Sequence, residues 1–140
     1  MAEFAFRLQK VLEYRRMMEG WAKEAWMEAK ARRLEGEADI ARIVGIRATS
    51  LTAQVERVDQ MIALENYLTR LDDEQRASEA LAAILREEEN SALIEWTKRR
   101  QDAEALEKLS ERERSQWELD QRRKEQAALD EWAVIRREAA

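Results

Sequence analysis

The chain has 140 residues and a formal net charge of −5, and it contains no Cys, no His and no Pro. Without Cys it can form neither a disulfide nor a thiolate metal site, and without His it lacks the commonest metal ligand and general base. With 39% charged residues, only 3 Gly and a mean hydropathy of −0.73, the composition is typical of long helices rather than of a globule with many loops. We therefore expect an all-α protein.

The charges are unevenly spread. Residues 1–33 carry 8 basic and 5 acidic side chains, residues 34–95 carry 6 and 14, and residues 96–140 carry 11 of each. A nucleic-acid-binding protein usually shows a basic stripe, so the acidic total argues against nucleic acid as a partner. The Glu clusters lack the His that di-metal helical centres use, and no Gly-rich phosphate loop is present. We therefore expect no enzyme activity, no cofactor and no metal site.

The chain shows no sign of membrane insertion or secretion. It has no run of about 18 apolar residues that could span a bilayer. The opening Phe4-Ala5-Phe6-Arg7 leads directly into charged sequence rather than into the apolar core of a signal peptide. We therefore expect a cytoplasmic protein.

The first helix is expected to begin near residue 3 and to reach about residue 50. Phe6, Tyr14, Met17 and Trp26 lie outside the apolar face predicted for its first part. The first 27 residues are thus apolar over a wider face than a two-stranded seam requires. The extra apolar residues either improve packing near a frayed end or form a surface for a second partner. The predicted face consists of Phe4, Leu8, Val11, Leu12, Met18, Trp21 and Ala25.

The stretch of residues 41–62 shows a coiled-coil pattern of alternating three- and four-residue steps. Around Gly45 and Thr49 it also has weak helix propensity and good capping residues, which predicts the closed end of a helical hairpin nearby. The expected seam residues are Ala41, Val44, Ala48, Leu51, Val55, Val58 and Ile62.

Two positions are possible for the turn: about residues 49–59, or about residues 72–77. The unbroken heptad through residue 62 favours the later turn, but that turn would pair the apolar residues 12–27 with the highly charged residues 107–126. The earlier turn pairs them with residues 84–94 and leaves residues 107–126 as a solvated overhang, so we prefer it. The predicted fold is a long two-helix antiparallel coiled-coil hairpin, a single domain of residues 1–140 with helices at about 3–50 and 59–137.

The second helix is expected to carry a seam that mixes apolar and polar residues. Buried polar residues in such a seam reduce stability but fix the register. The seam comprises Leu64, Leu68, Leu71, Gln75, Ser78, Ala82, Leu85, Glu89, Ala92, Trp96, Arg99, Ala103 and Leu106.

Both ends of the chain resemble a known family. The opening FAFRLQKVLEYR (residues 4–15) resembles the start of the flagellar export protein FliJ, and RKEQAALDEWA (residues 123–133) is similar to that family's ending. The length and the helical composition fit over the whole chain. The resemblance implies a hairpin shaped like the rotating stalk of F-type ATPases, inserted in a hexameric flagellar export ATPase. It also implies contacts with the membrane export gate and with export chaperones, so that the chain is cytoplasmic and peripheral at the inner-membrane flagellar export apparatus.

The resemblance also implies two contact surfaces. Tyr67 and Leu71, in LENYLTRL (residues 64–71), match an aromatic and a leucine that contact the gate in this family, with Tyr in place of a Phe-type residue. The basic bias of residues 1–33, together with the family geometry, makes the open end the expected ATPase contact. The candidates there are Arg7, Lys10, Arg15 and Arg16.

Two other functions remain open. The chain could be the equivalent stalk of a virulence type III secretion system, or a structural coiled-coil spacer without an ATPase partner. A hairpin stalk should be a monomer when free, whereas a spacer should self-associate.

Overall fold

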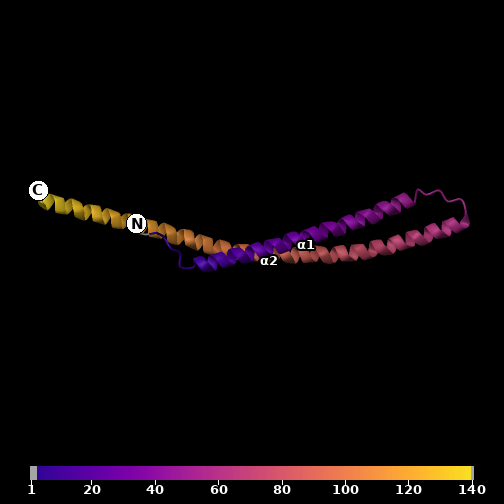
Figure 1. The fold of residues 1–140 in the computed structure, drawn as a ribbon, viewed down its shortest axis with the longest axis horizontal. Coiled ribbons are helices and arrows are strands. Elements are labelled where there is room, and N and C mark those ends of the chain that lie inside the picture. Colours follow the sequence, from indigo (N-terminus) through magenta and orange to yellow (C-terminus); the bar gives the residue numbers. More distant parts are fainter. Residues whose placement is uncertain (1–2, 140) are drawn as a thin grey trace. The chain divides into compact units, whose positions relative to one another are not determined.

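The computed structural model describes residues 3–139 and contains two helices. Helix α1 spans Gln9–Ser50 (42 residues) and α2 spans Val58–Ala139 (82 residues), with residues 51–57 connecting them and no strand within the described range (Figure 1). The two helices pack against each other as an all-α helical hairpin, which confirms the predicted fold class. No helix in this range is both long and apolar enough to cross a membrane.

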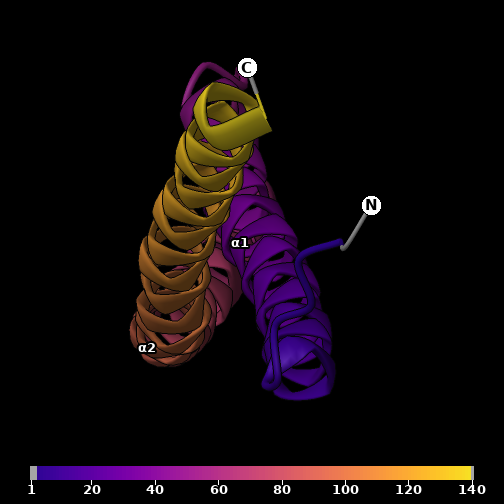
Figure 2. The same ribbon diagram turned by 90° about the vertical axis from the view of Figure 1, so that its left-hand side faces the viewer.

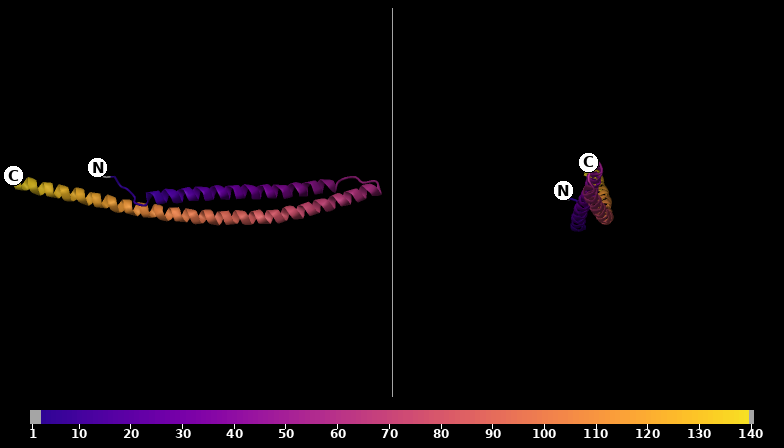
Figure 3. Two further views of the ribbon diagram at one scale, coloured as in Figure 1. Left: turned by 60° about the horizontal axis from the view of Figure 1, so that its bottom comes forward. Right: turned by 90° about the vertical axis from the view of Figure 1, so that its right-hand side faces the viewer.

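Contacts within the chain define two units. One contains residues 20–97, and the other contains residues 3–19 together with residues 98–139. In each unit a segment of α1 lies beside a segment of α2 that is distant in the sequence (Figure 3). That the whole chain acts as a single hairpin domain stays a prediction.

The connection between the helices has clear local causes. The hydroxyl groups of Thr49 and Ser50 bond back to the carbonyl oxygens of Gly45 and Ile46, at 3.0 and 2.8 Å, which competes with continued helical bonding. At the start of α2, the Gln60 side-chain oxygen accepts hydrogen bonds from the backbone N–H groups of Glu56 and Arg57, at 3.1 and 3.2 Å. Residues 72–77 lie inside α2.

The helix register differs from the expected one. Arg47, near the end of α1, pairs with Asp72 at 2.8 Å, although Asp72 lies about four turns into α2. The reason is that residues 51–57 do not form a tight turn, so α2 begins beyond the end of α1. Trp26 therefore stacks on Trp96, and the expected pairing of residues 12–27 with residues 84–94 is wrong.

The predicted seam of α2 is confirmed, whereas that of residues 41–62 is wrong. Every residue of the α2 seam from Leu64 to Leu106 is buried or half-buried. In contrast, Val44, Leu51 and Val58 are 46%, 57% and 72% exposed. α1 instead turns Ile40, Ile43 and Ile46 toward the interior, because three isoleucines bury more apolar area than the alanines of the predicted face.

The predicted face of the first 27 residues is also partly wrong. Trp21 is 56% exposed, whereas Trp26 is half-buried in the interface. Phe6 is 7% exposed because residues 3–8 precede α1 as a non-helical segment, so helical spacing does not govern where they point (Figure 2). Residues 107–126 are not a free overhang either, since Glu107, Ser110, Glu113 and Trp117 are half-buried.

Candidate partner-binding surfaces

The closed end of unit 20–97 presents a concentration of exposed apolar side chains. Val58, Met61 and Ile62 open α2 beyond the end of α1, and they are 72%, 56% and 55% exposed because no helix faces them. About three turns further along α2 lies a shallow groove of about 450 Å³, lined by Val44, Arg47, Ala48, Leu51, Asp72 and Gln75. This surface, Val44, Leu51, Val58, Met61 and Ile62, is called the tip patch below.

The two predicted gate-contact residues lie in different environments. The Tyr67 ring is 40% exposed, whereas Leu71 is only 4% exposed and belongs to the seam. Tyr67 is thus available to a partner in this structure, and Leu71 supports the packing of α2 on α1. Four of the five tip-patch residues fit the heptad predicted for the seam, so their spacing in the sequence indicated burial rather than a contact site.

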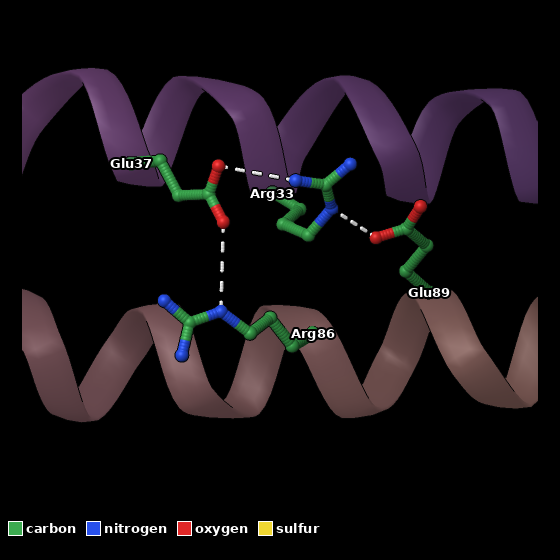
Figure 4. Close-up of polar contacts among 4 residues, drawn as sticks. All are labelled: Arg33, Glu37, Arg86 and Glu89. Atoms are coloured by element: carbon green, nitrogen blue, oxygen red, sulfur yellow. Dashed lines mark hydrogen bonds and ion pairs between the residues drawn. The ribbon is translucent and has the colours of Figure 1, made fainter.

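A polar cluster occupies the middle of the same unit. Arg33 of α1 forms an ion pair with Glu89 of α2 and another with Glu37 at 3.1 Å, and Arg86 of α2 reaches Glu37 at 3.5 Å (Figure 4). The hydrogen bond that Arg33 donates to the Glu89 carboxylate raises the pKa of Arg33 above its ordinary value. Because the cluster links both helices, it fixes which residues of α1 and α2 face each other.

The unit of residues 3–19 and 98–139 has a small core of its own. Phe6, Leu12 and Leu106 form that core, with Phe4, Leu8 and Leu109 packed against it. The Phe4 ring lies 6.0 Å from the Trp117 ring, and the Arg114 guanidinium lies 5.6 Å from the Phe4 ring. The non-helical start of the chain is therefore fixed onto α2 by aromatic contacts.

The four basic residues predicted for the ATPase contact fall into two groups. Arg15 donates to the backbone oxygen of Asp102 at 3.0 Å, and Arg16 pairs with Glu107 at 3.0 Å. Arg7 and Lys10 are exposed and form no ion pair within residues 3–139. Arg15 and Arg16 thus hold α1 on α2, and only Arg7 and Lys10 present charges without an internal role.

The last turns of α2 are uncovered. Every residue from 122 to 139 is exposed, including Leu129, Trp132 and Ile135 at 61%, 57% and 58%. The Arg136 guanidinium lies over the Trp132 ring, 5.1 Å from its centroid. The apolar run near the C-terminus was visible in the sequence, but the site prediction did not include it.

The comparison with protein families decides the identity. Residues 4–138 match the family described as Flagellar FliJ protein. The chain belongs to the FliJ family. The resemblance at the two ends is thereby confirmed, and the match extends over nearly the whole chain. No curated protein and no solved structure matched it.

FliJ family membership makes the chain a component related to flagellar protein export, in a family of non-catalytic components. Among residues 3–139, no group of acidic side chains is arranged to hold a metal ion. The candidate functional sites considered below are the exposed apolar and charged surfaces described above.

Proposed function

We propose that this FliJ-family chain is the central-stalk coiled coil of the flagellar export apparatus. In this proposal its open end inserts into the hexameric export ATPase, its closed end contacts the membrane export gate, and it also interacts with export chaperones. It acts in the cytoplasm at the inner membrane and is a monomer when free.

The uncovered end of α2 carries the ATPase part of the proposal. Leu129, Trp132 and Ile135 expose large apolar side chains that no part of the described chain covers. A buried aromatic anchor can contribute about 2 kcal/mol or more to a protein interface. Arg7 and Lys10, in the same unit, supply charges that can steer association with an acidic rim.

The tip patch and Tyr67 support the gate contact. Their apolar side chains are exposed on a stretch rich in acidic residues, so a suitable gate surface is apolar with basic groups around it. Leu71 contributes by holding α2 in place rather than by direct contact, because it is buried.

The deciding experiment measures ATP hydrolysis by the purified export ATPase with and without the chain. We expect the wild-type chain to stimulate hydrolysis. The double variant Trp132→Ala with Ile135→Gln should bind more weakly, so that about tenfold more of the chain is required for the same stimulation. Because both positions are exposed, circular dichroism should show an unchanged melting temperature. Met61→Gln, an exposed apolar position in the other unit, is the matched control and should stimulate like the wild type.

The charge contribution has its own test. Arg7→Glu with Lys10→Glu should weaken ring stimulation and flatten its dependence on salt, because rim charges act mainly through screened attraction. Reversal of Arg15 and Arg16 is a poorer test, since it also breaks their contacts with α2. Absence of any stimulation by the wild-type chain would refute the stalk proposal.

A further inference from the structure

Unit 20–97 has a second groove, separate from the tip patch. It has a volume of about 810 Å³ and lies between the middle parts of α1 and α2. Its α1 wall consists of two alanines and one arginine, and its α2 wall carries one large apolar, two acidic and two small side chains. The lining residues are Ala25, Ala29, Arg32, Ile84, Glu87, Glu88, Ser91 and Ala92.

The α2 wall of the groove is part of a longer line of residues at helical spacing, of which Ala77 and Leu81 lie beyond the lining. Ala77, Leu81, Ile84, Glu88 and Ser91 succeed one another in steps of four and three residues, so they form one line along α2. Leu81 and Ile84 are 53% and 54% exposed. The line is about 20 Å long, which equals about four turns of a helix. A third helix can therefore lie along it and bury both side chains.

The floor of the groove allows close approach. Ala29 and Ala92 have only a methyl group at the interface, and Ala25 is equally short on the α1 side. Large side chains of a docked helix can enter above these alanines, as ridges enter grooves in helix packing. The shape thus favours a helix with large apolar residues on one face.

The charges of the groove indicate the flank of that helix. Glu87 and Glu88 are exposed and form no ion pair within residues 3–139, in contrast to Glu89, which pairs with Arg33. Arg32 is the single basic residue of the lining, and it too forms no ion pair in this range. Two unpaired carboxylates against one guanidinium favour a partner with Lys or Arg beside its apolar face.

We propose that this groove, which we call the mid-groove, docks a basic amphipathic helix of another protein, forming a local three-helix bundle with α1 and α2. The apolar face of the partner covers Leu81 and Ile84, and its basic flank pairs with Glu87 and Glu88. This surface is independent of the ATPase and gate contacts proposed above, so each can fail without the other.

The test uses the full chain and a labelled synthetic peptide of about 18 residues, the length that spans the mid-groove. The peptide has Leu on one helical face and Lys beside it. Two controls have the same length: one with the sequence scrambled so that no apolar face forms, and one with Glu in place of Lys. We expect fluorescence anisotropy to show binding of the Lys peptide at least about tenfold tighter than of either control.

Variants of the chain assign the site. Glu87→Lys with Glu88→Lys should weaken binding of the Lys peptide about tenfold and reverse its preference over the Glu peptide. Ile84→Gln should weaken binding of both the Lys peptide and the Glu peptide. The matched controls are Asp73→Lys with Glu74→Lys, an exposed acidic pair elsewhere on α2, and Leu34→Gln, an exposed apolar position of α1 that does not line the groove. Each control should bind like the wild type, and all variants should keep their melting temperature.

Three results would overturn the proposal. The first is equal binding of the scrambled peptide. The second is equal weakening by the control variants, which would indicate nonspecific attraction to an acidic chain. The third is a dimer of the chain alone, seen by light scattering and dissociated by Ile84→Gln, because a second copy would then occupy the mid-groove.

Discussion

A Cβ atom added to Gly36 would lie 2.9 Å from the Cδ1 atom of Leu85, so α2 packs closely against α1 at this position, where the side chain is absent. The other two glycines of α1 have nothing within 4 Å of the same position. Gly20 and Gly45 therefore carry the helical penalty of glycine without a packing reason.

Gly20 and Gly36 thus predict a graded series of three variants. Gly20→Ala should raise the free energy of unfolding by about 0.5–1 kcal/mol, the gain in helix propensity. Gly36→Ala should gain less, because Leu85 must move, and Gly36→Val should destabilise the hairpin. Chemical denaturation monitored by circular dichroism measures all three. If Gly36→Ala stabilised as much as Gly20→Ala, the close approach to Leu85 would carry no penalty.

Trp26 and Trp21 should respond very differently to truncation. The Trp26 ring lies 5.1 Å from that of Trp96 with an interplanar angle of 26°, whereas Trp21 is 56% exposed. Trp26→Ala should cost about 2–4 kcal/mol through lost packing, and Trp21→Ala under about 0.5 kcal/mol. Thermal melts of the two variants provide the comparison. Equal losses would mean that Trp21 also packs.

The Arg33–Glu89 ion pair of the polar cluster should matter more than an exposed ion pair elsewhere on α2. Glu89→Ala removes the partner that raises the pKa of Arg33, and it leaves a guanidinium at the interface between the helices. We expect a clearly lowered melting temperature. Asp120→Ala, which removes an exposed ion pair with Arg123 within α2, should leave the melting temperature nearly unchanged. A double variant with Arg33→Met and Glu89→Leu should regain much of the loss, because a packed apolar pair replaces a broken one.

Tyr67 and Leu71 should separate binding from folding. Tyr67→Ala, at a 40% exposed position, should cost the fold under about 0.5 kcal/mol but weaken binding to the export gate. Leu71→Ala, at 4% exposure, should cost about 2–4 kcal/mol, so its binding defect would not be interpretable by itself. Binding assays with the cytoplasmic part of the gate, beside thermal melts, make the distinction. Should Tyr67→Ala melt as early as Leu71→Ala, the ring belongs to the core.

The absence of Pro and the abundance of Ala, Glu, Arg and Leu were sufficient to predict two long helices, because helix propensity is a local property. The seam of α2 was also predictable, since its apolar and polar residues follow one helical line from Leu64 to Leu106. The two ends of the chain carried enough family-specific sequence to indicate FliJ.

The tertiary structure alone decided which residues of α1 face α2. Two apolar lines run along α1, and spacing does not say whether Ile43 or Val44 turns inward. The register of α1 against α2 depends on the path of residues 51–57. This path brings Arg47 opposite Asp72 and so leaves Val58, Met61 and Ile62 uncovered. The surfaces proposed for partners depend on that register, because an apolar side chain becomes a binding site only where no segment of its own chain covers it.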